Sequence, residues 1–235
     1  MEASKQIREA MARVSKLRQM ASDVPELALA VHAIKQIQAN RFSSTYQDLL
    51  DSPIYSASAN FFLTELYSER DYSLRDAQFS RIAGALELTF PDQVVSTAVA
   101  LAKLHCLTEE LDMAMAQCWL TNTEGPPTSR YCVAWQMVGQ RTKRNWQLAT
   151  VLDIGLALDQ LTRKRGLRLM LKMMRRPAEL AGLGSLQMFL ESGFDSFSGI
   201  GRNGGSVQHF LSIVKARESD WLNLLFENSE MDPKI

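Results

Sequence analysis

The sequence has few of the residues that form disulfides and metal sites. It contains three cysteines and three histidines in 235 residues. Cys106 and Cys118 fall on one predicted helix, about 18 Å apart at ~1.5 Å per residue, which is too far for a disulfide. This cysteine usage favours a reducing compartment, and we expect a cytoplasmic protein.

Long apolar stretches are also missing. The longest stretch without Asp, Glu, Lys or Arg is residues 52–64, which is shorter than the roughly 20 residues that cross a bilayer. The first twenty residues alternate charged with apolar side chains, unlike the continuous apolar run of a signal peptide. We therefore expect no membrane span and no secretion.

The charges balance, with 26 basic against 26 acidic residues, so no overall field attracts nucleic acid or an anionic membrane. A local patch is still possible, because residues 163–176 hold seven basic side chains and no acidic one. Lys164, Arg168, Lys172 and Arg175 share one face of a predicted amphipathic helix. We expect this face to be solvated or paired internally. Its alternatives are an acidic partner, a nucleic acid or an anionic lipid.

Prolines and glycines divide the chain into predicted helices. The seven prolines stand where the apolar pattern breaks, and period-two alternation nowhere persists long enough for a sheet. Asp23 and Ser73 are predicted to cap two helices. A helix opening at Ser52-Pro53 is predicted to run through Tyr67. Residues 92–120 are apolar on most faces, which is typical of a central helix.

We predict one all-α domain over residues 1–235, a globular bundle of eight or nine helices. A loop near 121–129 is predicted to divide two helical halves, and 229–235 is predicted to be a disordered tail. The helices after that loop are expected at about 129–138, 143–164, 167–175, 178–197 and 206–227, with Gly139, Gly166 and the Gly199–Gly205 run as stops.

His105, Glu109 and Asp112 lie on one face of the predicted central helix. Imidazole and carboxylate at this spacing can bind a metal. Nothing else in the sequence supports a metal site, because no histidine has a glutamate three residues before it and no two histidines are four apart. We therefore expect His105 to be hydrogen-bonded within the protein, and we predict no metal and no cofactor. Haem ligation by His105 or His32 is the alternative.

Gly199-Ile-Gly-Arg-Asn-Gly204 fits the G-x-G-x-x-G pattern of a phosphate-binding turn. That turn must follow a β-strand, whereas Phe189, Phe194 and Phe197 indicate a helix before it. We interpret the segment as a loop between helices, and its role stays open.

Residues 61–67 (FFLTELY), followed by Arg70-Asp71 and by residues 75–82 (RDAQFSRI), resemble the FFLxxLY…RDxxFxRI signature of a family of uncharacterised bacterial all-helical proteins. Further similarity extends through Leu104-His105 and residues 181–186 to the Phe194 region. The resemblance implies an all-helical fold and a bacterial, cytoplasmic protein. It implies no activity.

By its residues alone, the segment around residue 70 is a polar turn between two helices. Arg75 and Arg81 are expected to form ion pairs with Asp71 and Asp76 there. If the protein has a pocket, Tyr67, Arg75 and Arg81 beside His105 are its expected polar lining.

Three functions are compatible with this sequence. The favoured one is a non-enzymatic binding or regulatory protein that meets a protein partner or a second copy of itself. The second is an enzyme or sensor that holds haem or a metal near His105. The third is a carrier of a small apolar or anionic ligand, with a cavity among five aromatic residues. These are Phe61, Phe62, Trp119, Trp135 and Trp146. Whether the protein is an enzyme is left open by the sequence.

Overall fold

The computed structural model describes residues 2–65, 70–164 and 166–227. Within these residues the chain forms twelve helices and no strand, which confirms the all-α prediction. The helices are α1 (Glu2–Ser22), α2 (Pro25–Thr45), α3 (Gln47–Leu50), α4 (Ser56–Glu65), α5 (Ser73–Thr89), α6 (Asp92–Thr121), α7 (Pro127–Val138), α8 (Arg141–Thr162), α9 (Leu167–Met173), α10 (Arg175–Leu180), α11 (Gly184–Arg202) and α12 (Val207–Glu227).

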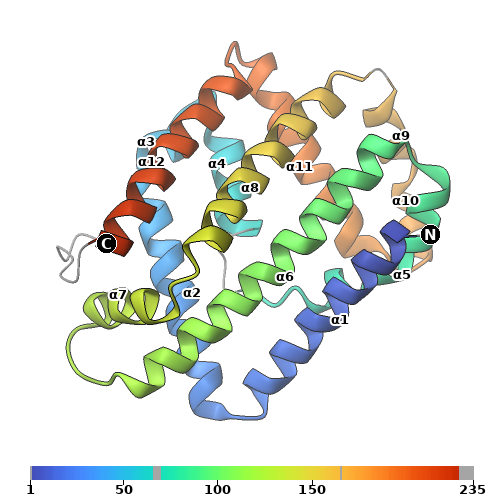
Figure 1. Cartoon of the computed structure of the whole chain (residues 1–235). Helices are drawn as coiled ribbons and strands as arrows, with labels where there is room; N and C mark the ends of the chain where they lie inside the picture. Colours follow the sequence, from blue (N-terminus) through green and yellow to red (C-terminus); the bar gives the residue numbers. More distant parts are fainter. Residues whose placement is uncertain (1, 66–69, 165, 228–235) are drawn as a thin grey trace.

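Helix α6 is the centre of the molecule, as predicted. Figure 1 shows it crossing the whole molecule, and it packs against α1, α2, α5, α7 and α8. Few of its 30 residues are exposed. The exposed ones are Asp92, Ser96, Lys103, Gln117, Leu120 and Thr121. Its polar residues Glu109 and Asp112 are buried near its middle, so the core must supply them with partners.

Three apolar clusters surround this polar middle. One joins the C-terminal half of α6 to α2 and α7, and includes Met115 and Trp135. A second joins α4, α11 and α12 through Phe62, Phe197 and Phe210. The third packs α1 and α5 against the N-terminal half of α6. The charged residues inside the molecule therefore lie where the three clusters meet.

The predicted number of eight or nine helices is too low, because several segments that read as single helices are broken. The predicted helix 178–197 is in fact α10 and α11, separated by Gly182, whose φ is +67°. Gly199 and Gly201 do not stop a helix, because both lie in the last turns of α11. The loop between helices that we expected at this motif is confined to residues 203–206.

The side-chain caps were also predicted wrongly. Asp23 accepts a hydrogen bond from the Gln19 amide, and no side chain caps α2. Asp71 accepts bonds from the backbone N–H and the hydroxyl of Ser73 at the start of α5 (2.8 and 3.0 Å). Asp76, three residues after Ser73, is buried and bonds to Arg18 and His105.

The loop after α6 covers residues 122–126, within the expected 121–129. All three cysteines are free thiols. Across the described ranges, no helix combines the length and apolarity needed to cross a membrane. Tyr67 and the predicted tail 229–235 lie outside the described residues.

Candidate functional site

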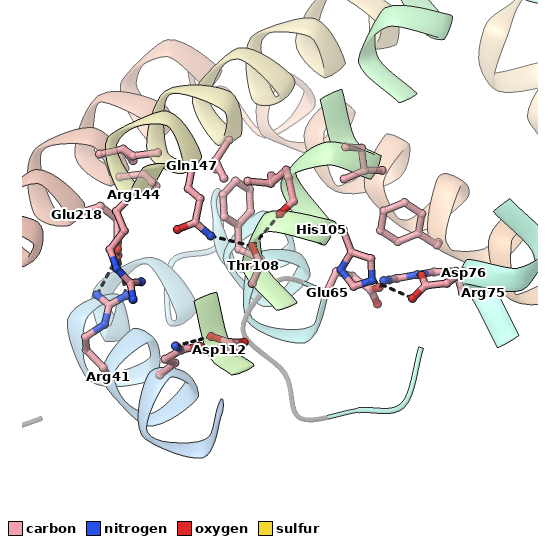
Figure 2. A pocket seen from close by; sticks show the side chains of 18 of the residues that line it. Arg41, Glu65, Arg75, Asp76, His105, Thr108, Asp112, Arg144, Gln147 and Glu218 are labelled. Carbon is pink, nitrogen blue, oxygen red and sulfur yellow. Dashed lines mark hydrogen bonds and ion pairs between the residues drawn. The ribbon is translucent and has the colours of Figure 1, made fainter. Parts of the chain in front are cut away.

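An internal cavity of about 150 Å³ lies beside α6, and its lining comes from α1, α2, α4, α5, α6, α7, α8, α11 and α12. Its polar lining consists of Gln38, Arg41, Glu65, Arg75, Asp76, His105, Thr108, Asp112, Tyr131, Arg144, Gln147 and Glu218, with Trp135 among the apolar residues. Figure 2 shows Arg41, Asp112, Arg144 and Glu218 at one end, which we call the arginine end. Glu65, Arg75, Asp76 and His105 lie at the other, the histidine end.

Helices α6 and α8 form the long walls of the cavity. Gln147 on α8 donates a 2.9 Å hydrogen bond to the Thr108 hydroxyl on α6, and this bond lies between the two ends (Figure 2). Arg144 lies one turn before Gln147 on α8, and Asp112 lies one turn after Thr108 on α6. The two helices therefore run in opposite directions past the cavity, and Arg144 comes level with Asp112.

At the arginine end, Arg41 is fully engaged by a carboxylate. Two of its nitrogens donate to the two oxygens of Glu218, at 3.0 Å each, and the Tyr46 hydroxyl donates to Glu218 at 2.9 Å. Both members of the pair are buried. This two-pronged geometry is the kind that offsets the cost of burying an ion pair.

Asp112 is buried beside this pair. Its Oδ1 accepts a 3.0 Å hydrogen bond from the Gln38 amide, and its Oδ2 lies 4.0 Å from the Lys35 ammonium. Burial raises the pKa of Asp112, and Lys35 only partly opposes it. Asp112 is also close enough to Arg144 for its charge to oppose the lowering of the Arg144 pKa.

Arg144 is an exception to the rule that buried polar groups have partners and, among the described residues, the one in the cavity lining that carries a charge. It is 5% exposed, yet its Nε and one terminal nitrogen have no hydrogen-bond partner in the described part of the chain. Its guanidinium lies 3.3 Å from the centre of the Trp135 ring, and the Trp135 indole N–H is also buried without a partner. Burial lowers the pKa of Arg144 to about 10, so it remains charged at neutral pH. Three N–H donors are thus gathered with no acceptor.

A tight turn sets Arg144 in this position. Gly139 and Gln140 have φ values of +61° and +62°, and Gln140 is the one non-glycine residue in the described ranges with positive φ. The turn folds α8 back so that its first residues lie over Trp135 of α7. Arg141, Lys143 and Arg144 all fall near the start of α8, with no acidic residue in its first turn. Cations are unfavourable at a helix N-terminus, where the helix dipole is positive, so this end of α8 favours an anion.

At the histidine end, His105 and Asp76 form a close pair. His105 Nε2 lies 2.8 Å from Asp76 Oδ2, and the same oxygen accepts a 2.8 Å bond from Arg18. Burial disfavours the Asp76 carboxylate, but His105, Arg18 and Arg75 outweigh it and lower the Asp76 pKa. Arg75 also pairs with Glu65 at 2.6 Å. His105 is thus hydrogen-bonded to an arginine-linked carboxylate on another helix.

Because Asp76 is a carboxylate, it can only accept a hydrogen bond. Nε2 of a neutral His105 therefore carries the proton, and Nδ1 is left with a lone pair. Figure 2 shows this second nitrogen on the side of the ring away from Asp76. No hydrogen bond to Nδ1 is found among the residues that the structure describes.

The structure places the predicted site residues in different surroundings. His105, Asp112 and Arg75 line the cavity. Glu109 is buried but outside the lining, where it accepts bonds from Lys35 and Arg18 (2.8 and 3.2 Å). Our expectation that His105 is hydrogen-bonded within the protein is confirmed, with Asp76 on α5 as its partner.

Two other predicted residues do not reach the cavity. Asp71 is exposed at the start of α5, and the Ser73 hydrogen bonds lower its pKa. Arg81 is exposed and donates to the backbone carbonyls of Ala181 and Gly182. The expected ion pairs of Arg81 and Asp71 are therefore wrong. Of the two arginines expected to pair here, Arg75 does contact Asp76, at 3.5 Å.

The basic face of residues 163–176 is largely paired with nearby groups. Arg168 lies 2.9 Å from Asp195, Arg175 donates to Glu191, and Lys164 donates to Gln93. Lys172 is exposed. The counter-charges come from α11.

The carrier hypothesis placed a cavity among five aromatic residues. Phe62 and Trp135 line the cavity, but Trp146 is 41% exposed and Phe61 and Trp119 pack elsewhere in the core. The residues that were missed include Arg144, Gln38 and Glu218. Arg144 belongs to the stretch Arg-Thr-Lys-Arg at 141–144, which looks like a solvated helix start. Only the turn at 139–140 reveals that one of its cations faces inward.

The metal and haem alternatives gain no support. In the described ranges, no three His, Cys, Asp or Glu side chains come together as a metal-ligand group. The cavity, at about 150 Å³, is below the ~300–1,000 Å³ of pockets for drug-sized ligands. A tetrapyrrole is larger than such ligands, so we do not carry the haem hypothesis further.

Fold and site together define an all-helical protein with a small, charged internal cavity. The chain belongs to the family described as "Domain of unknown function (DUF8198)", which matches residues 17–232. The matched region contains every charged residue that lines the cavity. No curated protein and no solved structure matches the chain significantly.

Proposed function

We propose that this protein is a non-enzymatic binding protein that holds a small carboxylate, or an anion of similar shape, in its central cavity. One observation carries the proposal. Arg144 and Trp135 line the cavity, and three of their buried nitrogen donors have no hydrogen-bond acceptor in the described part of the chain.

The chemistry of these groups defines the missing partner. Guanidinium and indole N–H groups donate hydrogen bonds and accept none. A buried donor without a partner costs roughly 1–3 kcal/mol, and more when it is charged. A carboxylate would accept several of these bonds and place a second negative charge beside Arg144. The arrangement therefore fits an anion better than a neutral ligand.

The size and walls of the cavity limit the rest of the ligand. A cavity of about 150 Å³ is large enough for roughly one benzene ring. Its lining includes Phe62, Leu104 and Val151 between the charged ends. We therefore propose an aromatic or branched aliphatic acid of roughly six to ten non-hydrogen atoms. We also propose that the protein acts in the cytoplasm, where its free thiols would persist.

Thermal unfolding with benzoate tests this proposal. Benzoate should raise the melting temperature of the natural protein, because a ligand at about 100 Kd stabilises the folded state by about 2.7 kcal/mol. Benzamide, which has the same shape without the charge, should raise it much less.

Two variants locate the effect. The Arg144→Met protein should lose the response to benzoate, while Lys143→Met, which removes the exposed neighbouring cation, should keep it. A cavity that holds only water would show no response to benzoate, isovalerate or acetate. That result, or an undiminished response of Arg144→Met, would refute the proposed function.

A further inference from the structure

We propose that the ligand has two polar ends: a carboxylate bound at Arg144 and a hydrogen-bond donor that reaches Nδ1 of His105. This inference rests on the proposed function and narrows its ligand to hydroxylated or aminated small carboxylic acids with an apolar middle. It is carried by the placement of an unpartnered acceptor at the end of the cavity opposite the unpartnered donors.

The two ends are separated by about two helical turns. Asp112, level with Arg144, and His105 are seven residues apart on α6, which corresponds to about 10 Å along the helix axis. Both side chains line the same cavity, and Figure 2 shows them at its opposite ends. The distance between the polar atoms at the two ends is shorter than this axial distance, because side chains such as that of Arg144 are long. A rigid six-membered ring with polar groups at opposite positions suits such a space.

At the histidine end, the contacts of His105 with Asp76 and Arg18 are both made through Nε2. Asp76 holds the Nε2 proton at 2.8 Å, and Asp76 is itself fixed by Arg18 at 2.8 Å and Arg75 at 3.5 Å. Since Nε2 is the donor in this pair, Nδ1 of the neutral ring accepts. An acceptor in a cavity selects a ligand hydroxyl or amine over a methyl group of similar size.

Two polar residues between the ends, Gln147 and Thr108, are hydrogen-bonded to each other. Gln147 donates to the Thr108 hydroxyl, and that hydroxyl donates to the Leu104 carbonyl at 2.9 Å. Around them, Leu104 and Phe62 are buried apolar side chains. The middle of the cavity therefore makes no further polar demand, which fits an apolar ring or chain between two polar groups.

Calorimetric titration of the full chain with three para-substituted acids tests the inference. The probes are benzoate, 4-methylbenzoate and 4-hydroxybenzoate. The methyl and hydroxyl compounds have nearly the same shape and differ in the donor alone. We expect 4-hydroxybenzoate to bind about tenfold more tightly than 4-methylbenzoate, as one buried hydrogen bond provides.

The His105→Phe variant supplies the matched control, because phenylalanine keeps the ring and removes the acceptor. In this variant the affinities for 4-hydroxybenzoate and 4-methylbenzoate should agree within about threefold, because the acceptor that distinguishes the two compounds is gone. Should this variant fold poorly, the comparison of the three acids on the natural protein still decides the question.

The outcomes separate this inference from the proposed function. Tight benzoate binding that depends on Arg144, with no preference between hydroxyl and methyl, would overturn the two-ended ligand and leave the binding function standing. A hydroxyl preference that persists in His105→Phe would also overturn it. If none of the three acids binds, both proposals fall.

Discussion

Two buried arginines line the cavity, and they differ in whether they have hydrogen-bond partners. The Arg41–Glu218 pair has two direct hydrogen bonds and a tyrosine hydroxyl. Arg144, equally buried, has an aromatic ring beneath it and free N–H groups. Buried charges without partners reduce stability and persist mainly where a ligand or a reaction uses them.

Replacing Arg144 by methionine should therefore separate stability from binding. The substitution removes an uncompensated buried charge but also the contact with the Trp135 ring. We expect the free energy of unfolding without ligand to stay unchanged or rise by up to about 2 kcal/mol, measured by chemical denaturation. Lys143→Met should stay within about 0.5 kcal/mol of the natural protein. A loss of more than about 1 kcal/mol in Arg144→Met would show that this arginine is structural.

The opposite result is expected for Arg41. Arg41→Met leaves the Glu218 carboxylate buried with the Tyr46 hydroxyl as its remaining strong partner, and we expect a loss of about 3–5 kcal/mol. The neighbouring pair of Arg217 with Asp48 is partly exposed, so Arg217→Met should cost less than about 1 kcal/mol. Equal losses in the two variants would contradict the distinction between these pairs.

Asp76 should make the fold sensitive to acid. Its folded pKa lies below the ordinary value of 3.8, so its contribution to stability is complete above that pH and is lost as the pH falls through the folded pKa. At neutral pH, Asp76→Asn should be less stable by about 2–4 kcal/mol, since Arg18 and Arg75 lose a carboxylate. The difference between the two proteins should shrink as the pH drops below 3.8. If the stability difference between the natural protein and Asp76→Asn did not change with pH down to that range, the charge of Asp76 would not be what stabilises the fold.

At the scale of single helices, predictions from sequence succeed where packing agrees with local pattern. Helix α6 was predicted within a residue at each end, because its apolar residues continue around most faces and prolines precede and follow it. The split between α10 and α11 was missed, since Pro177 suggests a helix start there and Gly182 makes the actual turn. Gly199 and Gly201 were wrongly predicted to end a helix. In sequence alone, a glycine that ends a helix cannot be told from a glycine that lies inside one and allows close packing. Gly193, for example, lies against the Phe61 ring.

Helix α9 is the element held least firmly by the core. None of its residues is buried, and Leu169 and Met173 are about 60% exposed. Its ion pair with α11, Arg168 with Asp195, and the Arg175–Glu191 pair of α10 lie at the surface, where such pairs contribute little. Replacing Arg168, Lys172 and Arg175 together by glutamine should change the free energy of unfolding by less than about 1 kcal/mol. A larger loss would mean that these pairs hold α9 and α10 against α11.

For the molecule as a whole, the sequence was sufficient for the fold class but not for the site. The all-helical bundle and its central helix follow from periodicity and proline positions. The cavity forms from side chains of α2, α5, α6, α8 and α12, which are far apart in the chain, and no local pattern reports their meeting. His105 and Asp112 were recognisable because they interrupt an apolar helix. Arg144 was not recognisable from the sequence. A single inward-facing cation among exposed ones does not produce a periodic pattern of side chains.

The claim that Arg144 anchors a carboxylate can be tested most directly by nuclear magnetic resonance of the arginine side chains. The Nε–H signal of Arg144, identified by its loss in Arg144→Met, should exchange slowly with water because it is buried. On addition of benzoate it should shift in a saturable way, as the carboxylate accepts its hydrogen bond. An Nε–H signal that exchanges as fast as those of exposed arginines, or that stays unmoved at saturating benzoate, would contradict the account.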